Sequence, residues 1–299
     1  MISEEKFPDG QINFKANTED IKSLLTPPYI LSNDNAINFT IDLSNWDKFQ
    51  TLLAANAKFR QTHKQINLHI GYLFGSRSDR KFEHDGINYF RDVIAKTIND
   101  QNFNKVTVFD PHSLAVENAI NNCESIHPFP QINHHFLNMV GNLDLSEYEI
   151  VIASPDLGAY KKVFGIFAKF SEKYPNIHFN FISANKIRSL SGDISMVLNP
   201  PYKEFDKSKK RILYLIDDIC DGGRTFIEFA KLLNEDFEKK YLYVSHGIFS
   251  KGLDPLLEHF DKIFTTNSIS NTYIKYLTND NTILNSNILF TTFISQRNE

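Results

Sequence analysis

The stretch Arg211-Ile-Leu-Tyr-Leu-Ile-Asp-Asp-Ile-Cys-Asp-Gly-Gly-Arg-Thr225 decides how the rest of this 299-residue chain is interpreted. Its apolar run predicts a buried strand that ends at two carboxylates. The only adjacent glycine pair in the chain follows a few residues later. A helical pattern then begins at Phe226. A strand, a turn of small residues and a helix start form an anion cradle, because backbone N–H groups and the helix dipole point into the turn. The stretch therefore predicts a phosphorylated-sugar site, in which Asp217 and Asp218 bind sugar hydroxyls or a magnesium ion.

Two other interpretations of this stretch compete with the sugar-phosphate site. A P-loop also holds phosphate, but it needs a lysine after its last glycine, and this loop has none. The stretch is also compatible with an acidic strand-to-helix turn that binds nothing, because short motifs often occur without function.

The composition is compatible with an α/β enzyme of two domains. A chain of 299 residues exceeds one typical domain, and 41% hydrophobic with 23% charged residues is typical of a globular protein. The net charge of -4 argues against binding to nucleic acid or anionic membranes. Two cysteines are too few for a disulfide framework or a cysteine metal site. Without a signal sequence or an apolar run of membrane length, we expect a soluble, cytoplasmic protein.

Apolar runs that predict strands alternate with helical patterns along both halves of the chain. Such alternation favours an α/β fold with doubly wound, mainly parallel sheets. The expected strands cover Ile37–Leu43, Ile66–Phe74, Lys105–Phe109, Glu149–Ala153, Ile177–Ser183, Arg211–Ile216, Tyr241–Ile248 and Ile263–Thr265, and the expected helices cover Trp46–Arg60, Ile87–Asn99, Tyr160–Tyr174 and Phe226–Phe237.

Irregular segments suggest where the domains divide and where loops lie. Prolines and polar residues interrupt the periodicity near residues 128–148, so we expect domains at 1–137 and 138–299. The segment Ser189–Ser208 predicts a long loop before the cradle strand, and loops of that length are often functional. The pair His134-His135 predicts a surface turn.

The cradle, Asp217-Asp218-x-x-Asp221-x-Gly223-x-Thr225, resembles the phosphoribosyl-pyrophosphate loop of type I phosphoribosyltransferases and ribose-phosphate pyrophosphokinases. Further segments resemble motifs of the pyrophosphokinases and occur in the same order, from residue 7 to about residue 269. They are Phe7-Pro-Asp-Gly-Gln-Ile-Asn13, Phe74-Gly-Ser-Arg-Ser-Asp-Arg-Lys81, Thr107-Val-Phe-Asp-Pro-His112, Val151-Ile-Ala-Ser-Pro-Asp-Leu-Gly158, Asn185-Lys-Ile-Arg188 and Thr266-Asn-Ser-Ile269. The resemblance implies two tandem type I phosphoribosyltransferase-like domains, with the ATP side at 1–137 and the sugar-phosphate loop at 217–225.

The resemblance also implies a reaction and the residues that serve it. The β,γ-diphosphoryl group of ATP would pass to the anomeric hydroxyl of ribose 5-phosphate or a larger 5-substituted ribose, with release of AMP and with Mg²⁺ as cofactor. By this resemblance the ATP-binding residues are Phe7, Asp9, Gln11, Arg77, Asp79 and His112, the metal-binding residues are His112 and Asp156, the catalytic residues are Lys186 and Arg188, and the residues for the sugar and its 5-phosphate are Asp217, Asp218, Asp221, Gly222, Gly223, Arg224 and Thr225.

Elementary chemistry gives these roles a rationale. Diphosphoryl transfer brings a highly charged nucleotide next to a sugar hydroxyl, so cations such as Lys186 and Arg188 must neutralise developing charge when a loop closes. Arg77 offers planar donors to phosphate or adenine. His112 follows a strand, which predicts a place in the crevice at the carboxyl ends of the sheet. Magnesium takes few protein ligands, so one carboxylate with one further side chain suffices.

The chain departs from the family pattern in the cradle itself. Gly222 replaces a threonine and Arg224 replaces a glycine. Arg224 either adds a charge-assisted contact to a 5-monophosphate or spans the diphosphate of a larger ester such as ADP-ribose, which would connect the protein to NAD metabolism instead of nucleotide biosynthesis alone. Gln11 stands where glutamate is common, and Ala159 where glycine is.

The short segment before Phe7 weighs against the usual hexamer and its allosteric site, although we still expect a homo-oligomer that acts on small molecules. Two other functions stay open. A phosphoribosyltransferase would consume the activated sugar, and a catalytically silent subunit would regulate an active partner.

Overall fold

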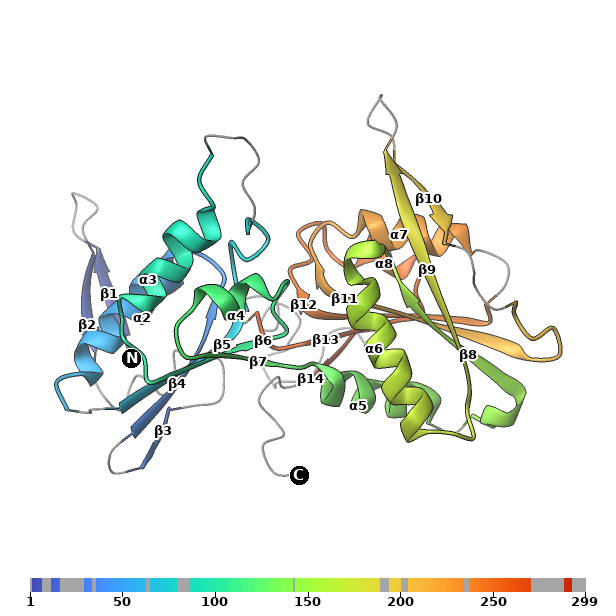
Figure 1. The fold of residues 1–299 in the computed structure, drawn as a ribbon, viewed down its shortest axis with the longest axis horizontal. Helices are drawn as coiled ribbons and strands as arrows, with labels where there is room; N and C mark the ends of the chain where they lie inside the picture. The colour runs from blue at the N-terminus through green and yellow to red at the C-terminus, as the bar shows by residue number, and fades with distance from the viewer. Residues whose placement is uncertain are drawn as a thin grey trace. The chain divides into compact units, whose positions relative to one another are not determined.

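The computed structural model describes residues 2–6, 12–16, 30–33, 36–62, 65–79, 86–141, 143–188, 194–199, 204–233, 237–269 and 288–291. The chain divides into two compact units, Met1–His127 with Asn267–Ser270, and Pro128–Thr266 with Asn271–Glu299. Each unit has a β-sheet and apolar core of its own (Figure 1).

The first unit contains a five-stranded sheet in the order β3-β4-β5-β6-β7. Strand β3 runs antiparallel to β4, and the other neighbours are parallel. A separate antiparallel pair is formed by β1 and β2. The strands are β1 (Ile2–Lys6), β2 (Ile12–Ala16), β3 (Ile30–Asn33), β4 (Ala36–Leu43), β5 (Gln65–Leu73), β6 (Lys105–Phe109) and β7 (Cys123–Ile126). The helices are α2 (Trp46–Phe59), the π-helical η1 (Phe90–Ala95), α3 (Lys96–Asn99) and α4 (Ala115–Ala119).

The helix α2 shows how the sequence builds this unit. Its start is fixed by Asn45, whose side chain accepts a hydrogen bond of 3.0 Å from the backbone N–H of Lys48. Phe49 and Leu52 lie one helical turn apart and are fully buried in the same core as the strands. The predicted helix over 46–60 is therefore confirmed.

The second unit contains a seven-stranded sheet in the order β10-β9-β8-β11-β12-β13-β14. All neighbours are parallel except the edge strand β10, which is antiparallel to β9. The strands are β8 (Tyr148–Ser154), β9 (His178–Arg188), β10 (Ile194–Leu198), β11 (Lys210–Cys220), β12 (Lys239–Gly247), β13 (Lys262–Thr266) and β14 (Ile288–Thr291). The helices are α5 (Phe129–Val140), the short 3₁₀ turn η2 (Leu145–Glu147), α6 (Leu157–Lys173), α7 (Arg224–Leu232) and α8 (Asp254–Leu257).

Strand β11 is covered on both faces, as its uninterrupted apolar run predicts. Leu213 and Leu215 lie in a core shared with residues of α7 and α8. The alternate residues Ile212, Tyr214 and Ile216 lie in a second core shared with residues of α5 and α6. The expected doubly wound α/β architecture is therefore confirmed in this unit.

Helix α5 differs from the expectation of an irregular segment and a surface turn. Ile132 and Phe136 are fully buried in the core of the second unit, and His135 is 1% exposed. Prolines at the start of this segment suggested a break, but a proline in the first turn fits a helix start, because no backbone N–H is needed there. The predicted boundary after residue 137 lies within this helix, whereas the two units divide after His127.

The segment expected to form a long loop over 189–208 contains β10. Met196 is buried and Val197 is exposed, which is the alternation of an edge strand with one covered face. Within the described parts of the chain, no helix is long and apolar enough to span a bilayer.

Candidate functional site

The strand β11 carries the paired carboxylates beyond the end of its neighbour β8. Pairing with β8 ends at Leu215 opposite Ala153, whereas pairing with β12 continues to Cys220 opposite Gly247. Asp217 and Asp218 consequently lie at the carboxyl edge of the sheet, with β12 on one side only. Ligands bind at this edge in open parallel sheets.

Asp217 is surrounded by negative charge. Burial raises the pKa of its carboxyl group well above the usual range, and the charges of Asp218 and Asp156 raise it further. Its Oδ1 accepts a hydrogen bond of 2.8 Å from the backbone N–H of Asp218. A half-buried acid with acidic neighbours is stabilised by a divalent cation or by hydroxyl donors. The site therefore suits Mg²⁺ or the hydroxyl groups of a sugar.

The turn that follows β11 requires glycine. Gly223 has φ +78°, which L side chains rarely adopt, and a Cβ there would lie 3.0 Å from Cδ2 of Leu256. This glycine occupies the cap position of α7, where no side chain supplies a cap. A helix start directs its first N–H groups into the turn, so the backbone can approach an anion closely. Arg224 is exposed and Thr225 is partly buried beside this turn.

Asp156 comes from the neighbouring strand end. It follows β8, and its Oδ1 accepts a hydrogen bond of 3.1 Å from the N–H of Ala159 as the cap of α6. The hydroxyl of Ser154 donates to the carbonyl of Asp156 at 2.8 Å. The structure thus gives Asp156 a capping role and brings its charge near Asp217, while its role as a metal ligand stays a prediction.

The turn after β12 is bound to the end of β11. The N–H groups of Ile248 and Phe249 donate to the carbonyl of Cys220, at 2.9 and 3.1 Å. The N–H of Ser250 donates to the carbonyl of Asp221 at 3.1 Å. These bonds fix the turn beside the cradle.

Lys251 extends from this turn along the cradle, and no sequence motif indicated it. Its Cε, Cδ and Cγ atoms lie 3.6, 3.7 and 3.9 Å from the position that a Cβ would occupy at Gly222. The available signal was a cation just after the next parallel strand, because the carboxyl ends of parallel neighbours meet at one edge of a sheet.

Lys186 and Arg188 lie on the part of β9 that extends past β8. Pairing of β9 with β8 ends at Ser183, and pairing with β10 places Lys186 opposite Met196. These two cations were expected at a loop entry, but their backbone belongs to a strand of an antiparallel hairpin (Figure 1). Their side chains lie outside the described part of the structure, so their catalytic role stays a prediction.

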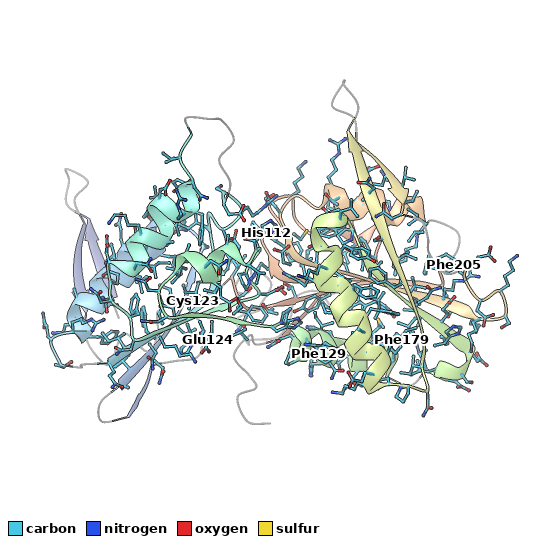
Figure 2. The ribbon with its side chains drawn as sticks, viewed as in Figure 1. His112, Cys123, Glu124, Phe129, Phe179 and Phe205 are labelled. Atoms are coloured by element: carbon cyan, nitrogen blue, oxygen red, sulfur yellow. The ribbon has the colours of Figure 1, made fainter. Side chains whose placement is uncertain are left out.

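In the first unit, the turns after β5 and β6 are joined at the carboxyl edge. Asp79 follows β5, and its Oδ2 accepts a hydrogen bond of 2.7 Å from the hydroxyl of Ser113. The neighbouring His112 is exposed in the turn after β6 (Figure 2). Asp110, which opens that turn, has a φ of 39°, unusual for a residue other than glycine. The expected ATP-binding residues Arg77, Asp79 and His112 thus lie on two adjoining turns.

The remaining expected ATP-binding residues, Phe7, Asp9 and Gln11, lie outside the described residues. Among the residues that are described, no three histidine, cysteine or carboxylate side chains gather as they would around a metal held by protein alone.

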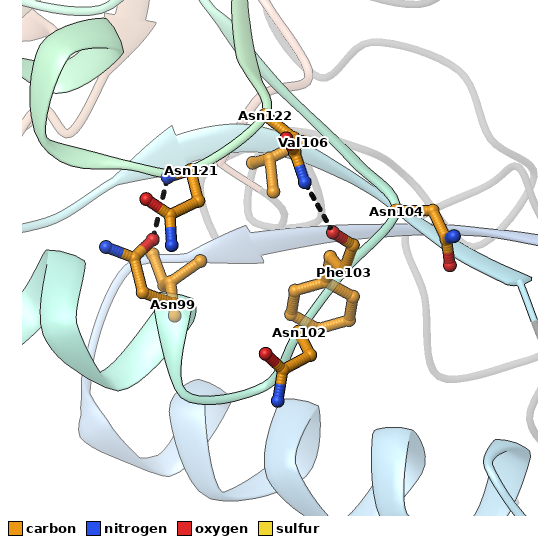
Figure 3. A pocket seen from close by; sticks show the side chains of 8 residues that line it. Asn99, Asn102, Phe103, Asn104, Val106, Asn121 and Asn122 are labelled. Carbon is orange, nitrogen blue, oxygen red and sulfur yellow. Dashed lines mark hydrogen bonds between the residues drawn. The ribbon is translucent and has the colours of Figure 1, made fainter.

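A cavity of about 260 Å³ in the first unit has a different character (Figure 3). It lies near the start of β6, at the opposite edge from His112. Its asparagines hold the backbone: the N–H of Asn121 donates to Asn99 at 2.8 Å, and the amide of Asn122 donates to the carbonyl of Phe103 at 3.2 Å. The lining consists of Ile98, Asn99, Asn102, Phe103, Asn104, Val106, Asn121 and Asn122, which carry no charge to bind a nucleotide.

Comparisons with known proteins identify chains that are similar to this one. No protein-family model matches the chain. The chain is similar to the ribose-phosphate pyrophosphokinase of Mycoplasmopsis pulmonis, with 26% identity over 231 residues, and the match covers 74% of this chain but only 64% of that protein, less than two thirds of its length. It is also similar to the ribose-phosphate pyrophosphokinase of Pyrococcus furiosus, with 22% identity over 268 residues that cover 89% of this chain and 85% of that protein.

Among solved structures, the chain is similar to a crystal structure of phosphoribosylpyrophosphate synthetase from Mycobacterium smegmatis. The TM-score is 0.68 at 16% identity, and the match covers 98% of this chain and 86% of that chain. Together with the two separate sheets, this likeness confirms the expected fold of two tandem phosphoribosyltransferase-like α/β domains.

Proposed function

Since this chain is a distant member of the ribose-phosphate pyrophosphokinase family, we propose that it is an ATP-dependent diphosphokinase. It transfers the β,γ-diphosphoryl group of ATP to the anomeric hydroxyl of ribose 5-phosphate, or of a larger ribose 5-ester, and releases AMP. One observation carries this proposal: the acidic pair near the end of β11 is followed, after three residues, by a glycine turn that caps α7.

The second unit binds the acceptor sugar in this proposal. Asp217 and Asp218 hold the ribose 2- and 3-hydroxyls, directly or through magnesium, because carboxylates accept hydrogen bonds from hydroxyl groups. The turn from Asp221 to Thr225, with Gly222, Gly223 and Arg224, binds the 5-substituent through backbone N–H groups and the guanidinium. The acidic and anion-binding halves of the cradle thus recognise opposite ends of one sugar phosphate.

The first unit binds ATP. Arg77 and His112 offer cationic and imidazole donors from neighbouring turns, and the bond between Asp79 and Ser113 holds those turns together. Phe7, Asp9 and Gln11 complete the nucleotide site. His112 in this unit and Asp156 in the second unit are the candidate protein ligands of magnesium, which would supply positive charge to the triphosphate.

Lys186 and Arg188 stabilise the negative charge that develops on the transferred group. Charge neutralisation and positioning account for most of the catalysis of phosphoryl transfer, so no strong general base is required among the side chains of this protein. The hairpin of β9 and β10 carries the backbone of both cations beyond the neighbouring strand β8.

The acceptor's 5-substituent is the finer part of the proposal. Arg224, in place of a small residue, suits either a tighter contact to a monophosphate or a diphosphate bridge such as that of ADP-ribose. An assay that measures AMP release from ATP, with ribose 5-phosphate and ADP-ribose in parallel, distinguishes these acceptors. AMP release with ribose 5-phosphate but not with ADP-ribose would eliminate the larger acceptor as a substrate.

The same assay tests catalysis itself. We expect Lys186→Ala to lower AMP release by about 100-fold or more, because one cation on the transferred group is lost. Lys207→Ala removes an exposed lysine elsewhere in the second unit and serves as the matched control. No AMP release from the unaltered protein with either acceptor would favour a silent regulatory subunit, and pyrophosphate release from phosphoribosyl pyrophosphate with a nucleobase would favour a phosphoribosyltransferase.

A further inference from the structure

We propose that Lys251 is a specificity-determining residue of the cradle, which binds the anionic 5-substituent of the acceptor together with Arg224. This inference rests on the proposed function of the cradle and adds a residue from a separate turn to it. The substrate class that it names is a ribose whose 5-ester carries two negative charges.

The position of the lysine stem is the first argument. Three of its carbons follow the face of Gly222, at 3.6 to 3.9 Å from the position where a Cβ would stand. The ammonium lies one bond, about 1.5 Å, beyond Cε. The stem therefore packs beside Gly222, and the positive charge is held within reach of a group bound in the turn.

The rigidity of the turn is the second argument. A Cβ at Gly247 would lie 2.2 Å from Cε2 of Phe249, so only glycine permits this close approach. Phe249 itself is buried with a φ of 49°, and the next residue donates its N–H to Asp221. Such unusual backbone persists only where the surroundings hold it, and it is frequent at binding sites. The turn therefore presents Lys251 from a fixed place.

The charge around the lysine is the third argument. Asp217, Asp218 and Asp221 all lie on the segment beside it. Nevertheless, Lys251 forms no ion pair or hydrogen bond through its ammonium with any residue of the described ranges. The stem of this exposed lysine packs along a glycine turn, and its ammonium makes no bond to the described residues. The ammonium is therefore available to an anion.

Two cations distinguish the class of acceptor. Backbone N–H groups alone can bind the oxygens of a phosphate group at a helix start. Arg224 and Lys251 add two full positive charges at the same turn. A 5-phosphomonoester and a 5-diphosphodiester each carry about two negative charges near pH 7. Both present the anion that this pair fits, whereas free ribose does not.

Lys251→Met tests the inference, because methionine keeps an apolar stem against Gly222 and removes only the charge. We expect the KM for ribose 5-phosphate to rise about tenfold, while kcat and the KM for ATP stay within about twofold. Lys251→Arg should restore most of the lost affinity. Lys231→Met, which alters an exposed lysine at the far end of α7, should leave all three constants unchanged.

A second readout separates this inference from the proposed function. Calorimetric titration with ribose 5-phosphate, and in parallel with ADP-ribose, needs no turnover. Weaker binding of either ester by Lys251→Met, with the loss reduced at high salt, would support the inference even if AMP were never released. Equal binding by the unaltered protein and Lys251→Met would overturn it, even if the diphosphokinase reaction were established.

Discussion

Two acids at opposite ends of one sheet, the buried Glu149 and the half-buried Asp217, differ in what surrounds them. Glu149 lies at the start of β8, and its carboxylate accepts hydrogen bonds of 3.0 Å from the amide of Asn180 and from the N–H of Asp206. Arg211, its register partner on β11, places Nε 3.7 Å away. Asp217 lies near the other end of β11. Burial raises the pKa of its carboxyl group, and its acidic neighbours raise that pKa further.

This difference is the one expected between a structural acid and a candidate ligand-binding acid. A buried charge is costly unless donors and countercharges compensate it. The protein itself compensates Glu149, whose side chain is fully buried, so that acid has no need of a ligand. The acids around Asp217 instead accumulate negative charge at the edge where ligands bind, so a cation or a polyol would complete that site.

The largest expected effect comes from removing the acid at the ligand edge. Asp217→Asn should lower AMP release by about 100-fold or more, because a ligand of the sugar or metal is lost. The folded-state pKa lies above the unfolded value, so ionisation at neutral pH destabilises the fold, and the amide should leave the free energy of unfolding unchanged or raise it. Kinetics and urea denaturation measure the two quantities.

Glu258→Gln, an exposed acid after α8, is the control for that substitution and should change neither quantity. If Asp217→Asn lost activity only because it unfolded, the contrast between the two acids would be wrong.

The opposite behaviour is expected at the other end of the sheet. Glu149→Gln leaves Arg211, whose Nε lies 3.7 Å from Glu149, without its full countercharge. We expect the free energy of unfolding to fall by about 3 kcal/mol. The KM for both substrates, measured below the unfolding temperature, should not change. A loss of activity at full stability would mean that Glu149 serves the reaction as well.

Local patterns explain which of these features the sequence could predict. The apolar run before Asp217 predicted β11 because a strand covered on both faces is apolar throughout, and the glycine pair marked the turn because Gly223 needs a positive φ. These properties depend only on neighbouring residues. The same reasoning predicted the start of α7 to within two residues and the carboxylate pair near the end of β11, although that strand continues past both acids to Cys220.

Features that depend on pairing of distant segments were missed. Lys251 reaches Gly222 only because β12 pairs with β11 and its turn bonds to Cys220, which no local motif encodes. Helix α5 was missed because its prolines suggested a break, although Ile132, Phe136 and Met139 recur at helical spacing and are buried. Burial of that face was the fact that the sequence alone did not supply.

The two glycines of the cradle test how much of the ligand edge is fixed by backbone. Gly223→Ala should lower the free energy of unfolding by about 2 kcal/mol, because alanine is strained at φ +78° and its Cβ would press on Leu256. Gly222→Ala is the matched control, since its Cβ would make only ordinary contact with Lys251 at 3.6 Å. Chemical denaturation of both variants measures the difference, and equal stability would contradict the assigned turn.

A third group, the buried His135, extends the comparison to a side chain that stays neutral. His135 packs against Phe264 and Tyr243, with ring centroids 4.8 and 5.9 Å away. Burial lowers the pKa of His135 to about 3. Its hydrogen bond of 3.3 Å to the carbonyl of Thr265 raises the pKa, but by less than burial lowers it. Its Nδ1 has no hydrogen-bond partner among the described residues. Protonation of this ring in the folded state would therefore place a charge in an apolar core.

The pH dependence of stability should show this smallest effect. Below the ordinary histidine pKa of 6.5, His135 binds a proton in the unfolded chain, whereas in the folded chain it does so only near pH 3. The free energy of unfolding therefore falls as the pH falls between these values. Between pH 7.5 and 5.5 the loss amounts to about 1 kcal/mol. His135→Phe should flatten the profile of unfolding free energy by this amount, whereas His259→Phe, near the end of α8, should not. Parallel profiles for the unaltered protein and His135→Phe would show that His135 is protonated in the folded protein over this pH range. A buried charge without a countercharge would then cost little stability at His135, in contrast to the cost expected at Glu149.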